Sequence, residues 1–317
     1  MLRLQSTILL FALLFTHPSH ADEAKPLQDV TAKNSPTSFR AALAQIDSAD
    51  AGNFTKMTEL AIKAKQNGAN IIIFPESSLL GWLNPSAFTE APPIPGNASQ
   101  AFQEMAKTAN IWIASGLAEQ GPVPKNTKDE VHYAFDSAIL VDPTGQLVLH
   151  QRKLNVLQNA FDADKCPKEV LNETGGCNYS RGEVSDITVI QTPFGKTALL
   201  VCADAYTSDT TALDKLKQLE PHLVIVTWGV GAQKEQECGQ EWFNATTYSS
   251  QAAKYIGTAN VVGTNAVGNR PYGRFRPAVY CGYSGFALPS GTVGGVVANT
   301  TAGLNYFDIP FPKTVEN

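Results

Sequence analysis

Three side chains that can take part in bond-breaking chemistry each stand at the end of an apolar segment. Glu76 follows "NIIIFP", Lys153 follows "QLVLHQR" and Cys202 follows "TALLV". Apolar runs of this length are typical of buried strands, and α/β sheets place their ligand crevices at strand ends. A buried carboxylate is costly unless it is paired or protonated, so Glu76 needs a compensating environment. Taken singly, each residue also fits an ordinary role as a core cysteine, a surface acid or a surface lysine.

Together, the three residue types can perform nucleophilic catalysis. A cysteine reacts as its thiolate, so it needs a base or a nearby positive charge. Histidine is the usual base, but His132, His150 and His222 stand in no motif that indicates this role. A carboxylate whose pKa is raised by burial can take the proton instead. A lysine adds a cation that helps to hold the thiolate and, with a backbone N–H, the oxyanion of a tetrahedral intermediate.

The first residues have the pattern of a secretory signal peptide. Arg3 supplies the positive end, residues 8–15 the apolar stretch and residues 19–21 a small-x-small cleavage site ending at Ala21. We therefore expect a cleaved signal peptide over 1–21, a flexible lead over 22–36 and a secreted or periplasmic protein. The alternatives are a membrane anchor and a core helix, but the apolar run is too short to span a bilayer. No later segment predicts a membrane span.

Composition limits the remaining chain to ordinary globular classes. The sequence has 317 residues, of which 43% are apolar and 17% charged, and no break in composition indicates a second domain. We expect one domain over 37–317. A formal net charge of −5 argues against nucleic acid or an anionic membrane as partner.

Five cysteines leave one unpaired if the others form bridges in an oxidising compartment. Cys166 and Cys177 lie in one short loop rich in Pro, Gly and Asn and are positioned to close it. Cys238 and Cys281 then form a second bridge, and Cys202 remains as a candidate reactive thiol. The alternative is that Cys202 itself takes part in a disulfide.

Strand and helix patterns alternate in the first part of the chain and hairpins follow. Helices are predicted over 54–67, 101–109, 209–219 and 238–257. Strands are predicted over 39–47, 71–74, 111–119, 222–228 and 258–268, with hairpins over 134–153, 187–204 and 284–300. This mixture favours an α/β fold with mixed sheets over a purely parallel, doubly wound sheet.

The segments that carry the three residues resemble a known family. "FPES" with Glu76, "QRKL" with Lys153 and "LLVCAD" with Cys202 are similar in order and spacing to the Glu-Lys-Cys triad of the nitrilase (carbon–nitrogen hydrolase) superfamily. Downstream, "IVTWG", "SQAAKY", "ANVVGTNAVG" and "GYSGFALPSG" also look like this family. The resemblance extends from Phe39 to about Pro310.

The resemblance implies a four-layer α-β-β-α sandwich and thioacyl-enzyme chemistry without metal or cofactor. It implies that Cys202 attacks an amide carbonyl or a nitrile carbon of a small molecule while Glu76 takes its proton. Lys153 and the N–H of Ala203 would hold the oxyanion, and Glu76 would then protonate the amine and activate water. It also implies a homodimer, for which residues 206–219 are the candidate interface.

Two departures from the family pattern concern the substrate pocket. Many members carry a second glutamate shortly after the lysine, where this chain has Gln158 or Asn159, and the residue after the cysteine is usually aromatic but here is Ala203. Trp228 is a further pocket candidate from its place after the nucleophile. These changes keep two alternatives open: a nitrilase-fold binding protein without turnover, and a nitrile-hydrolysing member.

Four features look like the vanin and biotinidase branch of the superfamily. They are the expected secretion and the segments "GWLNPSAFTEAPPIPG", "KLNVLQNAFD" and "TPFGK" before "LLVCAD". Members of that branch cleave secondary amides of pantetheine and biotin conjugates. The expected function is therefore hydrolysis of a non-peptide amide bond outside the cytoplasm.

Overall fold

The computed structural model describes residues 36–125, 127, 130–276 and 278–311. The predicted signal peptide over 1–21, and all of the predicted lead except Pro36, lie outside the described residues. From Thr37 onward the chain forms one compact unit. Among the helices of the described part, none is long and apolar enough to cross a membrane.

The first sheet has six strands in the order β15-β1-β2-β3-β4-β5. Their bounds are β1 Ser38–Gln45, β2 Ile71–Ile73, β3 Trp112–Gln120, β4 Ala134–Val141, β5 Leu147–Arg152 and β15 Gly303–Pro310. Strands β1, β2 and β3 are parallel, whereas β4, β5 and β15 are antiparallel to their neighbours. The sheet is therefore mixed, as the sequence predicts.

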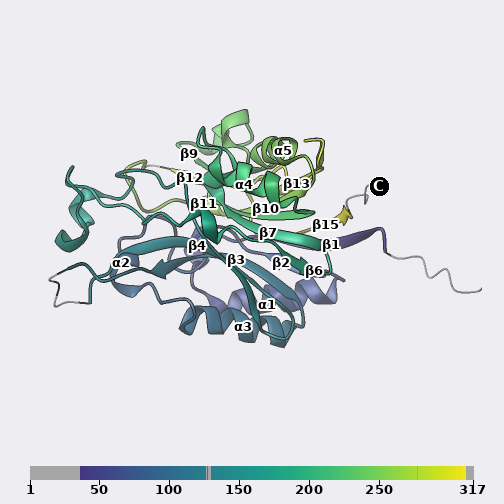
Figure 1. Ribbon diagram of the computed structural model, residues 1–317, viewed down its shortest axis with the longest axis horizontal. Helices are drawn as coiled ribbons and strands as arrows, with labels where there is room; N and C mark the ends of the chain where they lie inside the picture. Colours follow the sequence, from purple (N-terminus) through teal and green to yellow (C-terminus); the bar gives the residue numbers. More distant parts are fainter. Residues whose placement is uncertain (1–35, 126, 128–129, 277, 312–317) are drawn as a thin grey trace, which may run out of the picture. The chain divides into compact units, whose positions relative to one another are not determined.

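Two helices cover the outer face of this sheet: α1 (Phe54–Gln66) and α3 (Asn97–Ala109), which lie together in Figure 1. Their buried stripes pack against the sheet through side chains such as Met57 and Phe102. Helix α1 begins where the Asn53 side chain accepts from the Lys56 N–H, because a polar cap satisfies one of the free donors of the first turn.

The second sheet has the order β14-β13-β10-β8-β7-β6. Its strands are β6 Ile190–Thr192, β7 Gly195–Val201, β8 Leu223–Trp228, β10 Asn260–Asn265, β13 Gly285–Ala287 and β14 Val293–Val296. Strands β7, β8 and β10 are parallel, and helices α4 (Thr211–Leu219) and α5 (Ala245–Ile256) cover the outer face.

The two sheets pack face to face and share one apolar core. Leu43 and Ile73 of the first sheet and Val224 and Val226 of the second belong to the same buried cluster. Figure 1 shows the resulting order of layers, with α1 and α3 on one outside and α4 and α5 on the other. This confirms the four-layer α-β-β-α sandwich of mixed sheets.

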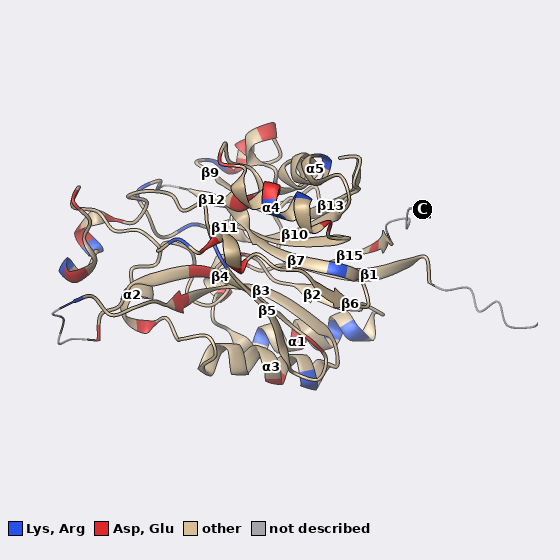
Figure 2. Cartoon of the chain, viewed as in Figure 1, with Lys and Arg blue, Asp and Glu red and all other residues tan. Residues whose placement is uncertain are grey.

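Charged residues gather on the helices and loops, while the strands between the helix layers carry few (Figure 2). This distribution follows from the cost of removing charge from water, which is largest between the sheets. The charges that do lie inside the protein therefore need an explanation, and several of them meet at one place.

Smaller elements complete the described part. These are a short sheet of β9 Gly231–Ala232, β11 Val267–Asn269 and β12 Val279–Cys281, and the short helix α2 Ala87–Glu90. Both predicted disulfides are present, Cys166–Cys177 and Cys238–Cys281, and Cys202 is free.

The structure differs from the sequence prediction in several places. The strand predicted over 258–268 is divided between β10 and β11, which belong to different sheets, and β9 and β12 were not predicted. The helix predicted to begin at Cys238 begins only at Ala245, because Asn244 caps it and accepts from the N–H groups of Thr246 and Thr247. The segment before it is held by the disulfide to Cys281. Strand β15 was not predicted, since its pairing with β1 joins segments far apart in the sequence.

Candidate active site

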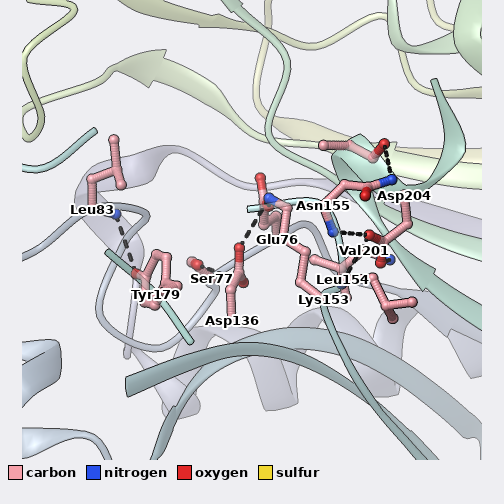
Figure 3. A network of polar contacts seen from close by, with 11 residues as sticks. Glu76, Ser77, Leu83, Asp136, Lys153, Leu154, Asn155, Tyr179, Val201 and Asp204 are labelled. Atoms are coloured by element: carbon pink, nitrogen blue, oxygen red, sulfur yellow. Dashed lines mark hydrogen bonds and ion pairs between the residues drawn. The ribbon is translucent and has the colours of Figure 1, made fainter. Parts of the chain in front are cut away.

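The three candidate catalytic residues come from different strands and meet inside the protein. Glu76 follows β2, Lys153 follows β5 and Cys202 follows β7, and each residue is at most 5% exposed. Lys153 Nζ donates a short hydrogen bond to Glu76 Oε1. Cys202 and Lys153 line one cavity. Figure 3 shows the Glu76 and Lys153 side chains pointing toward each other.

The position of Glu76 is fixed by backbone that approaches it closely. Its N–H donates to the carbonyl of Trp228 at 3.2 Å, which ties the turn after β2 to the end of β8. A Cβ at Gly229 would lie 1.8 Å from Glu76 Oε2, and one at Gly116 would lie 2.6 Å from Glu76 Cα. Only glycine leaves room for the glutamate at these two positions.

A second buried carboxylate, which the sequence analysis missed, joins the pair. Asp136 lies in β4 with no exposed surface, and its Oδ2 is 3.2 Å from Lys153 Nζ. Its Oδ1 accepts from Ser77 Oγ at 3.3 Å. One ammonium group therefore holds two carboxylates (Figure 3). The signal that could have revealed it is a single acid inside the otherwise apolar run "AFDSAILV".

This arrangement changes the protonation of both partners. Burial raises the pKa of Glu76 well above its ordinary value, the charge of Lys153 opposes that rise, and Asp136 adds to it. Burial by itself lowers the pKa of Lys153, but the two carboxylates outweigh it and hold that pKa well above its ordinary value. A glutamate with a raised pKa is a stronger base than a solvated one.

Cys202 sits at a strained turn. Its φ of 43° lies in the left-handed region that non-glycine residues rarely adopt. The following turn is fixed by Asp204, whose buried carboxylate accepts from the N–H groups of Leu154 at 2.9 Å and Asn155 at 2.7 Å. Because Leu154 and Asn155 directly follow Lys153, Asp204 ties the cysteine turn to the lysine (Figure 3).

The surroundings of Cys202 favour its thiol form. Burial raises the pKa of the Cys202 thiol, the charge of Glu76 adds to the rise, and the attraction of Lys153 only partly offsets it. A nucleophile in this state must lose its proton to a base as it reacts, since the thiolate is the reactive form.

The cavity beside these residues has a volume of about 180 Å³. Its lining contains five aromatic residues and, as its two cations, Arg270 and Lys153: Trp82, Lys153, Leu157, Cys202, Ala203, Tyr206, Gly229, Val230, Gly231, Trp242, Tyr248, Arg270 and Phe275. A larger hollow of about 630 Å³, which Asp47 and Tyr272 help to line, includes none of the three candidate catalytic residues.

Three predicted pocket residues do not line this cavity. Trp228 is fully buried, and its Nε1–H donates to Ser249 Oγ of α5 at 3.2 Å, so its ring faces the helix layer. Gln158 accepts from Asn178 Nδ2 at 3.0 Å, and Asn159 also bonds to Asn178. These amides stabilise the cysteine-bridged loop. Ala203, by contrast, does line the cavity.

Among the residues that the structure describes, no three His, Cys, Asp or Glu side chains are grouped as a metal site requires. The absence of a metal or cofactor in the reaction remains a prediction from the family resemblance.

A family model described as carbon-nitrogen hydrolase matches residues 40–316. The chain belongs to the carbon-nitrogen hydrolase family. The expected membership of the nitrilase superfamily is thereby confirmed, and the matched segment includes the three candidate catalytic residues and both sheets from Arg40 onward.

Several relatives carry names of amide-hydrolysing enzymes. Omega-amidase NIT2 of Mus musculus is 27% identical over 172 residues, which cover 53% of this chain and 56% of the relative. Biotinidase of Takifugu rubripes is 26% identical over 195 residues, covering 53% of this chain and 35% of the relative. The chain thus spans about half or less of the length of these curated relatives.

Solved structures show the same fold. An amidase from Nesterenkonia sp. AN1 superposes with a TM-score of 0.64 at 18% identity, covering 87% of this chain and 92% of the amidase.

Proposed function

We propose that this protein is an amidase that hydrolyses a non-peptide C–N bond through a thioacyl intermediate on Cys202. The observation that carries this proposal is a free, buried thiol that lines one cavity with Lys153, whose ammonium is bonded to a buried glutamate. Family membership supports the reaction class. A solved mutant of the Nesterenkonia amidase has a covalent acetamide group at its active-site cysteine, which also supports the proposal.

The first half of the reaction transfers the acyl group to sulfur. As Cys202 Sγ attacks the amide carbonyl carbon, its proton moves to Glu76. The oxygen gains negative charge, which the Lys153 ammonium and the N–H of Ala203 stabilise. The C–N bond then breaks, and Glu76 gives the proton to the departing amine, which leaves a thioester on Cys202.

The second half releases the acid. Glu76 takes a proton from water as the water oxygen attacks the thioester carbon, and the same oxyanion position is used again. The C–S bond breaks, and Glu76 returns the proton to Cys202. One water is consumed, one amine and one acid are formed, and all three residues recover their starting states.

The further expectations belong to the same proposal. We infer a single hydrolase domain over 37–317, exported with cleavage after Ala21, and the two disulfides and the biotinidase relative support export. The biotinidase relative is also compatible with the vanin and biotinidase branch. A homodimer through residues 206–219 completes the proposal. Mass spectrometry of the mature N-terminus and light scattering of the purified protein would test these points.

Two alternatives make different predictions. A nitrile-hydrolysing enzyme is compatible with the arylacetonitrilase relative from Fusarium vanettenii, which is 29% identical over 116 residues. A binding protein without turnover was favoured by the missing second glutamate. Asp136, the second carboxylate on Lys153, does not replace that glutamate, because it does not line the cavity.

A substrate panel assayed with wild type and one variant distinguishes the proposed amidase from these two alternatives. Wild type and Cys202→Ala would be assayed for ammonia or amine release from a short aliphatic primary amide, a nitrile, pantetheine and biotinyl-lysine. We expect wild type to cleave at least one amide and Cys202→Ala to cleave none. Activity that survives in Cys202→Ala would overturn the nucleophile assignment, and cleavage of the nitrile alone would favour the first alternative.

A further inference from the structure

Seven Asp, Glu, Lys or Arg residues in the described part of the chain are more than nine-tenths buried: Glu76, Glu119, Asp136, Lys153, Asp162, Asp204 and Arg270. Six of them have a charged or hydrogen-bonding partner. Glu76 and Asp136 share Lys153, Glu119 is paired with Arg152, Asp162 with Arg276, and Asp204 accepts backbone N–H groups. Arg270 is the exception.

Arg270 has no acidic partner among residues 36–125, 127, 130–276 and 278–311. Its side chain is 8% exposed, and its Nε is buried without a hydrogen-bond partner. The guanidinium carbon lies 4.9 Å from the ring centroid of Trp82 and 5.7 Å from that of Phe275. Aromatic faces attract the guanidinium cation, but they do not accept hydrogen bonds from the N–H groups that point outward in the guanidinium plane. Buried donors without acceptors are costly, so the site favours a ligand that supplies acceptors.

The guanidinium belongs to the wall of the catalytic cavity. Arg270 and Cys202 line the same space. The Trp82 ring is close to both cations: its centroid is 5.6 Å from Lys153 Nζ and 4.9 Å from the Arg270 guanidinium carbon. The two cations are therefore no farther apart than the sum of these distances. A Cβ at Gly231 would lie 2.8 Å from Arg270 Nη1, so glycine there leaves room for the guanidinium.

These observations define the ligand chemistry. Arginine presents a planar fork of donors that matches a carboxylate in bidentate geometry. Because both cations lie close to the Trp82 ring, a carbonyl at Lys153 and a carboxylate at Arg270 can belong to one short carbon chain in this cavity of about 180 Å³.

We propose that Arg270 binds a carboxylate at the far end of the substrate, so that the protein prefers a short aliphatic monoamide of a dicarboxylic acid. The proposal rests on the amidase function for the position of the scissile carbonyl beside Cys202 and Lys153. The carboxylate accepts hydrogen bonds from the unpaired donors of Arg270, and the distance from Arg270 to Cys202 determines the length of the substrate chain. The chemical step is carried out by Glu76, Lys153 and Cys202.

The test compares two substrates that differ in the carboxylate: glutaramic acid and pentanamide. We expect wild type to have at least a tenfold higher kcat/KM for glutaramic acid. Arg270→Gln should raise KM for glutaramic acid by about 10- to 100-fold, the range for lost hydrogen bonds between charged groups, with pentanamide hydrolysis little changed. Arg270→Lys should fall between the two, since it keeps the charge but loses the fork.

The matched control is Arg274→Gln, which removes an exposed arginine from the same segment. We expect Arg274→Gln to have the wild-type kcat/KM for both substrates. Circular dichroism would show that each variant is folded, and Arg270→Lys replaces Arg270→Gln if the latter is not. Equal kcat/KM of wild type for the two substrates, or an equal loss for both substrates in Arg270→Gln, would overturn the proposal.

Calorimetry separates a failure of this proposal from a failure of the amidase function. Binding of glutaramic acid and pentanamide would be measured on Cys202→Ala with and without Arg270→Gln. If wild type hydrolyses no amide, the amidase function fails, but binding of glutaramic acid that requires Arg270 still supports the carboxylate subsite. Absent binding, or equal binding with and without Arg270, overturns it.

Discussion

Replacing Asp136 with asparagine tests why Glu76 can serve as a base. The substitution keeps the shape of the side chain and an oxygen that can accept from Ser77 and Lys153, but it removes one negative charge. Both carboxylates contact the same ammonium, with Asp136 Oδ2 at 3.2 Å from Lys153 Nζ. We therefore expect a change in the protonation of Glu76 more than a change in the fold.

The size of the effect follows from the short separation of the charges. Two unit charges about 4 Å apart interact by about 4 kcal/mol at an effective dielectric constant of about 20. Side-chain relaxation and sharing of the Lys153 charge reduce this value, and we expect the pKa of Glu76 to be lower in Asp136→Asn than in wild type. The base remains ionised to lower pH, but it is weaker, and kcat should fall by about tenfold.

Other groups around Glu76 bear on this prediction and stay in place. Lys153 bonds to it directly, and Cys202 and the hydroxyls of Tyr179, Tyr206 and Tyr280 lie near enough to sense its charge. Asp204 and Arg270 are the nearest charges beyond these, through their effects on Lys153 and Tyr280.

The assay is kcat/KM against pH for the preferred amide. In wild type, activity should fall as pH drops through the raised pKa of Glu76, because protonation removes the base. In Asp136→Asn this acid limb should move to lower pH, because the Asp136 charge no longer raises the pKa of Glu76. Asp162→Asn is the control, since it removes a buried carboxylate that is paired with Arg276 away from the triad. An unmoved acid limb in Asp136→Asn, with activity simply reduced, would refute the electrostatic reasoning.

Two further predictions concern packing and stability. Gly229→Ala should lower kcat by at least about 100-fold, because its methyl group would displace the Glu76 carboxylate. The control is Gly303→Ala, where a Cβ meets no atom within 4 Å, and its kcat should equal that of wild type. Burial alone would raise the pKa of Glu119, but bonds from its neighbours, including Arg152, lower it to about 2. Glu119→Gln should therefore lower the free energy of unfolding by about 3 kcal/mol at neutral pH. In urea titrations this difference should shrink as pH falls from about 4.5 to about 2, and a constant difference would contradict the pairing.

The triad could be located from sequence because its members share a simple placement. Each of Glu76, Lys153 and Cys202 follows an apolar strand, and α/β sheets gather such strand ends in one crevice. The two cysteine bridges were predictable for a similar reason, since one pair lies in a single loop.

The remaining site residues depend on contacts that no local pattern reveals. Asp136 lies inside a strand, and its role follows from the register that turns it toward Lys153. Arg270 follows a short strand in a loop without periodicity. Trp228 looked like a pocket residue because it closes a strand, but its indole is directed to Ser249 in the helix layer.

The central claim is a covalent acyl group on Cys202, and intact-mass spectrometry tests it most directly. Wild type would be mixed with the preferred amide, quenched with acid during turnover and digested to locate any adduct. We expect the mass of the acyl group on the peptide that contains Cys202, formed with release of the amine. Steady turnover with no adduct on that peptide, together with undiminished turnover by Cys202→Ala, would contradict the account.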